Sequence, residues 1–419
     1  MAPVRVPRLS ALRFAFPAVI AKLQGEGGYV LGRAAALGSK PAILLLANHL
    51  AGNATASLIA VVFVVVNLAM AASGFNSHRD FYKLYFGEKK QRNLKRNYQS
   101  YINATTLQIF LAVIPIFMYM YWRHGQPMLA FVMGVYFASE RLADEAQRFL
   151  IFQGARAEWG HKIFLKACIQ VFGVATACAV ASGEGAATLA VVALAAGNVV
   201  PYAGRLRWAH LPKRWSMALD GWRACREQTN YWILSAVTAP IAYMDRIVVI
   251  IYKQSDMAMF MLLVSCLSIT QNAMEYFFYS MRRKEILQAK LNLREFLFSR
   301  SMHAIVGGSA AIGVVLSLIV LNQYSRQSID YWSLIPIVLI SQISLALSMV
   351  IRDIIFWNRD IFRLTLLEAC FVAAVFVLLL ALRAAGADYV VALGVLSALL
   401  VGRLTLLGGL SRAVQFSEL

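Results

Sequence analysis

The sequence predicts an all-α polytopic membrane protein of twelve transmembrane helices, arranged as two six-helix lobes. Three observations support this fold class: twelve long apolar stretches, basic residues confined to alternate connections, and a pattern that repeats in the second half of the chain. With 60% hydrophobic and 15% charged residues, the 419-residue chain is too apolar for a water-soluble protein.

Each apolar stretch is about 18–24 residues long, the length that an α-helix needs to cross the ~30 Å hydrocarbon core of a bilayer. The predicted spans are residues 28–47, 54–74, 101–122, 128–149, 163–182, 187–204, 229–252, 257–280, 302–322, 331–351, 362–382 and 389–411.

Basic residues alternate between the two sides of these spans. Of the 40 Lys and Arg residues, about 27 lie in the N-terminal segment and the even-numbered connections, whereas Arg123, Lys253 and Arg326 lie in the odd-numbered ones. Because Lys and Arg are retained on the cytoplasmic side, both termini are predicted to be cytoplasmic, in a bacterial inner membrane. The net charge of +19 is then a topology signal and an attraction to anionic lipid, so we expect no nucleic-acid partner.

The two halves repeat loop lengths and charge at an offset of about 200–205 residues. Because six helices is an even number, the copies have the same orientation and form a parallel repeat, which suits two bundles that rock about a central cavity. The predicted divisions are a cytoplasmic N-terminal segment 1–27 with an interfacial helix at 9–24, an N-lobe 28–204, a cytoplasmic linker 205–228 that acts as a hinge, a C-lobe 229–411 and a cytoplasmic tail 412–419.

The sequence carries no pattern that is typical of an enzyme. The five cysteines form no CxxC pair and are read as small core residues, and the sequence lacks an ATPase motif. We therefore expect no catalytic residue, no cofactor and no metal site.

Charged residues inside spans are the candidate functional residues, because a charge in lipid is costly and usually faces a cavity or a partner. Lys40 in the first span and Asp245 in the seventh both lie near mid-depth and are 205 residues apart (245 − 40), the repeat offset. We predict that they face each other across the cavity. Adjacent helical residues diverge by about 100°, so Asp245 is not expected to neutralise Arg246.

Two other groups of charges lie toward the cytoplasmic ends of spans. In the fourth span, Arg141–Glu145 and Asp144–Arg148 have the i, i+4 spacing of ion pairs, which either tie the bundle together or line the substrate path. The second group is expected to be structural and comprises Arg352, Asp353, Arg363 and Glu368, while Arg383 and Arg403 occur singly.

The seventh and eighth spans carry a family resemblance. The segment YMDRIVVIIYKQSDMAMF (243–260) resembles the start of the C-terminal lobe in polysaccharide flippases of the multidrug/oligosaccharidyl-lipid/polysaccharide exporter superfamily. The outer turn LANHLAGNATASLIAVVF (46–63) resembles the family's Ala-Arg-x-Leu-Gly turn, with Asn48 in place of the Arg and Ala51 in place of the Gly.

The resemblance implies a V-shaped, two-lobe transporter that moves a lipid-linked oligosaccharide from the inner to the outer leaflet by alternating access. A cationic cavity would suit an anionic lipid diphosphate, and acidic residues could carry a coupling H⁺ or Na⁺. The residues expected to line that cavity are Lys40, Tyr243, Asp245, Arg246, Glu275 and Tyr276. Other polysaccharide-assembly proteins (exopolysaccharide or O-antigen) would be its partners.

Three alternatives remain open. A drug/cation antiporter of the same superfamily should have a cavity dominated by acidic residues, whereas the mid-depth charge here is mixed. A polysaccharide polymerase should have a large external loop, whereas every predicted external loop is under about ten residues. A non-transporting membrane component of polysaccharide assembly is the third.

Overall fold

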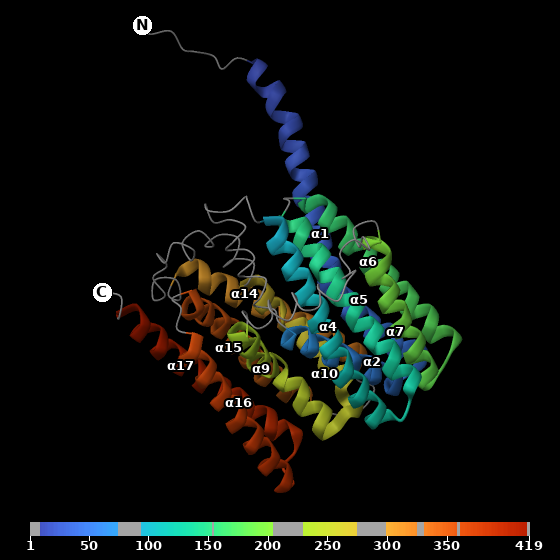
Figure 1. Ribbon diagram of the computed structural model, residues 1–419, viewed down its shortest axis with the longest axis vertical. Coiled ribbons are helices and arrows are strands. Elements are labelled where there is room, and N and C mark those ends of the chain that lie inside the picture. The colour runs from blue at the N-terminus through green and yellow to red at the C-terminus, as the bar shows by residue number, and fades with distance from the viewer. Residues whose placement is uncertain are drawn as a thin grey trace.

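A computed structural model describes residues 9–73, 94–152, 155–203, 229–274, 299–324, 331–357 and 361–416. Within these ranges the chain is all-α, and twelve long helices account for most of it (Figure 1). The all-α fold class and the multi-pass membrane character are therefore confirmed.

The N-lobe contains the first six helices and the C-lobe the last six. In the N-lobe these are α1 (Leu9–Ala51), α2 (Asn53–Ala72), α4 (Leu94–His124), α5 (Pro127–Phe152), α6 (Arg156–Val180) and α7 (Gly183–Val199), followed by the short η2 (Val200–Tyr202). In the C-lobe they are α9 (Thr229–Lys253), α10 (Met257–Leu267), α14 (Arg300–Tyr324), α15 (Leu334–Trp357), α16 (Ile361–Ala384) and α17 (Tyr389–Phe416), with η4 (Gln254–Asp256) before α10 and η5 (Tyr331–Ser333) before α15.

Each helix coincides with one predicted span, usually with a few extra residues at its predicted cytoplasmic end. The outer turns are short because glycine closes them: Gly52 ends α1 with φ 86° and Gly386 follows α16 with φ 74°, backbone angles that other residues rarely adopt. The helix of the eighth span is interrupted by a turn at Ser268 and resumes to Met274, where the described part ends.

Ten helical segments of the described chain are long and apolar enough to cross a membrane. One of them, Ile233–Met274, contains both α9 and α10. The helix α5 is not among them, because its cytoplasmic half carries five charged side chains between Glu140 and Arg148. The ten segments are therefore consistent with twelve spans.

The two lobes repeat each other in their packing. The helix α1 packs along α6 in the N-lobe as α9 packs along α16 in the C-lobe, and α5 packs along α7 as α15 packs along α17. The lobes meet through the second helix of each: α2 contacts both α9 and α10, and α10 also contacts α1 (Figure 1).

The crossing of α1 and α6 is the closest helix contact in the N-lobe. A Cβ atom added to Gly160 would collide with the backbone carbonyl of Gly28, and one added to Gly32 would lie 2.6 Å from the Cα of Gly160. Small residues allow this approach, which a membrane protein uses to gain packing contacts between helices.

Among the described side chains, the lobes share an apolar core on the side of the predicted outer turns. One large cluster joins residues of both lobes there, including most of α2 and α10. Toward the opposite ends of the helices, a cluster around Leu150 and Trp159 contains described residues of the N-lobe alone, and one around Val350 and Leu407 contains those of the C-lobe alone. Within the described residues, the lobes are thus joined at the predicted outer side and packed separately at the opposite side.

Several predictions concern segments at the ends of the chain or between the lobes. Residues 9–27 are helical but continue the axis of α1 away from the bundle (Figure 1), so an interfacial position for residues 9–24 stays a prediction. The start of the tail belongs to α17, which continues to Phe416. The linker 205–228, with its role as a hinge, lies outside the described residues.

Candidate functional site

Lys40 lies on α1 and is held by uncharged partners on α2. Its Nζ donates a hydrogen bond to Oδ1 of Asn67 at 3.3 Å and lies 5.7 Å from the centre of the Phe63 ring. Within the described chain no carboxylate lies at ion-pair distance from this ammonium, although the residue is only partly exposed. Lys40 is therefore a membrane-depth cation whose charge is not cancelled by direct contact.

Asp245 on α9 is bound within its own lobe. Its Oδ1 accepts a hydrogen bond from Nη1 of Arg246 at 3.3 Å, and its Oδ2 accepts one from Nε2 of Gln342 on α15, also at 3.3 Å. The expectation that Asp245 cannot neutralise Arg246 is therefore wrong. The reason is the reach of the arginine, which folds back along α9, donates to the carbonyl oxygen of Ala242 at 2.8 Å and so brings its second contact to the carboxylate.

The predicted direct pairing of Lys40 with Asp245 is absent in this conformation. Asp245 is bound instead to Arg246 and Gln342, and Lys40 to Asn67. The guanidinium of Arg246 also lies 5.1 Å from the centre of the Tyr243 ring. Lys40 and Arg246 are thus cations on α1 and α9, the helices that hold equivalent positions in the two lobes.

A polar network in the N-lobe was not predicted from the sequence. Lys166 on α6 donates to both carboxylate oxygens of Glu140 on α5, at 2.8 and 3.0 Å. On α7, Asn198 accepts a hydrogen bond from Gln170 and donates one to Ser139, both at 3.1 Å. Lys166, the fourth residue of the predicted span 163–182, could have indicated this network, because a lysine inside a span requires a polar partner; that partner is Glu140.

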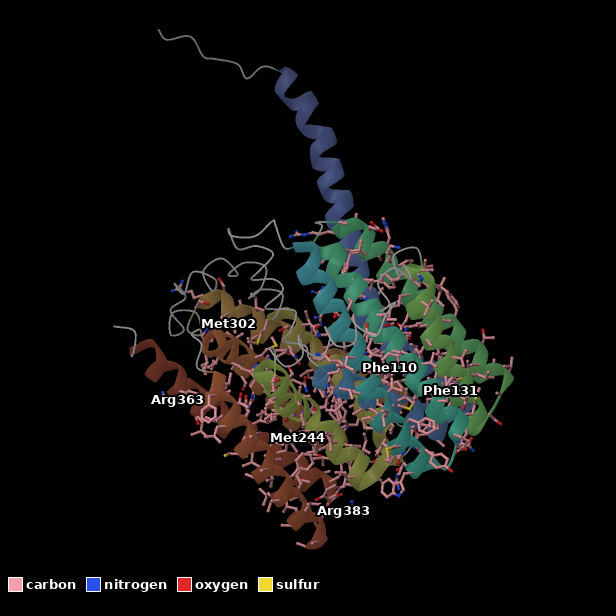
Figure 2. The ribbon with its side chains drawn as sticks, viewed as in Figure 1. Phe110, Phe131, Met244, Met302, Arg363 and Arg383 are labelled. Atoms are coloured by element: carbon pink, nitrogen blue, oxygen red, sulfur yellow. The ribbon has the colours of Figure 1, made fainter. Side chains whose placement is uncertain are left out.

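The C-lobe contains a matching buried pair. Glu368 on α16 accepts two hydrogen bonds from the guanidinium of Arg403 on α17, one of them 2.7 Å long from Nε, and both side chains are buried. Arg403 was expected to stand alone, and that expectation is wrong. The structural role expected for Glu368 with Arg352, Asp353 and Arg363 stays a prediction. Arg363 lies near the end of α16 opposite to Arg383 (Figure 2).

The polar positions of the two lobes correspond at the repeat offset. Glu140 and Gln342 are 202 residues apart (342 − 140), as are Lys166 and Glu368 (368 − 166), and each pair lies on equivalent helices. Together with Lys40 and Asp245, three polar positions of the N-lobe therefore recur in the C-lobe with a different charge. The two lobes therefore carry polar residues at corresponding positions, but the residue types differ.

The ion pairs predicted within α5 are confirmed. Arg141 Nη1 lies 3.2 Å from Glu145 Oε1, and Arg148 Nη2 lies 2.8 Å from Asp144 Oδ2. Arg141 is fully buried and also contacts Asp144 at 3.3 Å. Pairing of this kind lowers the cost of charge in the membrane, and whether these pairs also line a substrate path stays a prediction.

At the predicted outer side, the lobes touch through polar groups. Asn53 and Ser57 at the start of α2 both donate hydrogen bonds to the carbonyl oxygen of Ser255 in η4, at 2.9 and 2.8 Å. Nearby, Arg123 at the end of α4 donates to the side chain of Gln254 at 3.3 Å. The outer end of the lobe interface is thus closed.

Two predicted cavity residues, Glu275 and Tyr276, lie outside the described residues. The other four are described. Lys40 lies on α1, and α9 carries Tyr243, Asp245 and Arg246; these two helices hold equivalent positions in the two lobes. Around them, exposed aromatic side chains such as Phe110 on α4 and Phe131 on α5 cover the outside of the N-lobe (Figure 2), as expected of a surface that contacts lipid.

The comparisons with known proteins find similarity in structure and none in sequence. No protein family and no curated protein sequence matches this chain. Among solved structures, it is similar to the inward-facing conformation of a multidrug resistance MATE family transporter of the MOP superfamily, with a TM-score of 0.43 and 12% sequence identity over 92% of this chain and 96% of that chain.

Proposed function

We propose that this protein is a transporter of the multidrug/oligosaccharidyl-lipid/polysaccharide exporter superfamily, which moves an anionic lipid-linked oligosaccharide from the inner to the outer leaflet by alternating access. The observation that carries the proposal is that α1 and α9, equivalent helices of opposite lobes, each carry a cation inside the predicted span, Lys40 and Arg246, and that Lys40 has no carboxylate at ion-pair distance in the described chain. An anion bound between them would interact with both lobes at once and so favour one arrangement of the lobes over another.

The distribution of the apolar core supports alternating access. Because the lobes share a core at the outer side and have separate cores at the other, the structure has the character of an inward-open state. Opening to the outside would separate Asn53 and Ser57 from Ser255 and would also part the apolar contacts that the two lobes share on that side. A net hydrogen bond contributes only about 0.5–1.5 kcal/mol, so the shared apolar cluster accounts for most of the closure that substrate binding must overcome.

A drug/cation antiporter is the second candidate function, because Glu140 and Asp245 are acidic residues within spans. Each of them already contacts a cationic side chain, Lys166 and Arg246 respectively. A cationic substrate or coupling ion would have to compete with that partner. The flippase proposal relies first on Lys40, which has no carboxylate at ion-pair distance in the described chain.

The test is a leaflet-resolved assay with purified protein in proteoliposomes. A fluorescent polyprenyl-diphosphate oligosaccharide is reduced from outside by dithionite, so the protected fraction reports its movement between leaflets. We expect flipping by the natural protein, and at least a tenfold slower rate for Lys40→Gln. The matched control is Arg383→Gln, which removes an exposed cation at the end of α16 and should flip at the natural rate.

Two results would refute the flippase proposal: equal rates for Lys40→Gln and the natural protein, or efflux of a cationic dye without lipid movement. The second result would favour the antiporter. Size-exclusion profiles of each variant show whether a slow rate reflects loss of folded protein.

A further inference from the structure

An apolar groove of about 550 Å³ lies between the two lobes, bounded by α2, α4 and α9. Its walls include Val64 and Leu68 of α2, Leu111 and Pro115 of α4, and Ile247 and Ile251 of α9. Leu111 lines the groove while 45% exposed, so the groove opens on the surface that contacts lipid. A groove with these walls suits a hydrocarbon chain.

The equivalent place in the C-lobe is closed. There α14 packs closely along α10, because Gly313 brings its backbone against Cys266, where an added Cβ would lie 3.0 Å from the carbonyl oxygen. In the N-lobe, α4 makes few contacts with α2. The region of α4 that corresponds to Gly313 carries the larger residues Leu111 and Ala112, which line the groove. Within the described residues, the close approach of α14 to α10 thus has no counterpart between α4 and α2, where the groove lies.

The groove has polar groups at its ends. Gln108 lines it toward the predicted cytoplasmic end, and Tyr119 toward the outer end. Gln108 is 4% exposed, and its Oε1 has no hydrogen-bond partner in the described part of the chain. A buried acceptor without a partner costs about 1–3 kcal/mol, so this amide oxygen favours a ligand that brings a hydrogen-bond donor, such as a hydroxyl group.

The groove adjoins the cationic site. On α2, Asn67 binds Lys40 while the next residue, Leu68, lines the groove. On α9, Arg246 is followed by Ile247 of the groove. Because successive helical residues point about 100° apart, the polar site and the groove occupy adjoining faces of the same two helices. A molecule with an anionic head and a long apolar chain would match both faces.

We infer that this groove holds the chain of a polyprenyl lipid whose anionic head group lies at the adjoining cations, Lys40 and Arg246. The inference rests on the proposed function, and it assigns the lipid part of the substrate to the groove between α2, α4 and α9. In an inward-open state, the head would lie toward the cytoplasmic leaflet and the chain would run toward Tyr119. The lipid would then contact both lobes before they move.

The test uses the full-length protein and polyprenyl phosphate that carries a diazirine in its chain. After irradiation, we expect cross-linked peptides from α2, α4 and α9, and loss of the cross-link on addition of unlabelled polyprenyl phosphate. Ala112→Phe adds a large side chain to the groove wall and should lower cross-linking at least tenfold. Ile114→Phe places the same residue on the exposed side of α4 and should cross-link as the natural protein does.

A second variant leaves the wall of the groove unchanged. Lys40→Gln removes a cation beside the groove and should weaken polyprenyl phosphate binding several-fold without weakening that of the uncharged polyprenol. Equal cross-linking of Ala112→Phe and the natural protein would overturn the inference, as would equal competition by phosphatidylglycerol, which would make the groove a site for bulk lipid.

Failure of the inference can be told from failure of the proposed function. If the natural protein and Ala112→Phe both flip the oligosaccharide lipid at the same rate, the function stands and the groove assignment is wrong. If the natural protein is specifically cross-linked in the groove but flips nothing, the lipid site stands and the proposed function is wrong.

Discussion

Asn53 and Ser255 are separated by the repeat offset of 202 residues, and they touch: Asn53 Nδ2 donates to the carbonyl oxygen of Ser255 at 2.9 Å. In a symmetric assembly, equivalent residues meet only close to the symmetry axis. The pseudo-twofold axis that relates the lobes therefore passes near this contact, at the outer end of the interface. A lobe rotation that opens the outer side must separate these residues.

We expect that a cross-link at this contact stops transport. In a protein without its natural cysteines, Asn53→Cys combined with Ser255→Cys should form a disulfide on oxidation and reduce lipid flipping to background. Reductant should restore the rate, because the lobes are then free to part. Each single cysteine variant serves as a control. Full activity with the disulfide formed would show that the outer contact does not open during transport.

The buried pair Glu368–Arg403 should stabilise the C-lobe without taking part in transport. Arg403→Met leaves a buried carboxylate without its cation, which typically costs about 3–5 kcal/mol. We expect a lower melting temperature in detergent, and substantial recovery in Glu368→Met/Arg403→Met, where no charge remains. If the double variant melts as low as the single one, the loss reflects altered packing and not an uncompensated charge.

The predicted topology can be tested by cysteine labelling in intact cells. With a membrane-impermeant maleimide, Gln126→Cys in the outer turn before α5 should be modified, whereas Lys290→Cys in a basic connection should be protected until the membrane is permeabilised. The reason is the concentration of Lys and Arg in the even-numbered connections. Modification of Lys290→Cys from outside would invert the proposed direction of every helix.

The crossing of α1 and α6 should not tolerate even one methyl group. Gly160→Ala forces the added Cβ against the carbonyl of Gly28, and overpacking of this kind costs about 1–3 kcal/mol or more. We expect a lower melting temperature and a lower yield of monodisperse protein. Gly307→Ala on α14 adds the same methyl group where no atom lies within 4 Å; it should be neutral or slightly stabilising. Equal behaviour of the two variants would be evidence against a close crossing.

The helices could be predicted from the sequence because membrane insertion depends on local length, apolarity and flanking charge. The site could be predicted only in part. The 205-residue spacing of Lys40 and Asp245 identified equivalent positions, yet equivalence in a parallel repeat does not imply contact, since each residue is surrounded first by its own lobe. Lys166 and Glu368 are related in the same way. This relation is hard to recognise from the sequence, because a charge near the end of a span is also typical of the membrane edge.

The partners of Glu140, Asp245 and Glu368 depend on helix rotation and side-chain reach, which spacing along one helix does not determine. This is why the i, i+4 pairs of α5 were predicted correctly, whereas the pair between α16 and α17 was not. The groove beside α4 depends on how closely one helix approaches another. That distance is set by packing across three helices, so no local pattern of residues reports it.

The contact between Gly28 and Gly160 also has a consequence for biosynthesis. The first span enters the membrane about 130 residues before its packing partner has been synthesised, a delay of roughly ten seconds at about 5–20 residues per second. During that time the glycine face of α1 has no permanent neighbour, and its 43-residue helix must wait in the bilayer or against the translocation machinery. The N-lobe can therefore reach its final packing only when its fifth span arrives, which makes α6 the helix that completes the fold of the first.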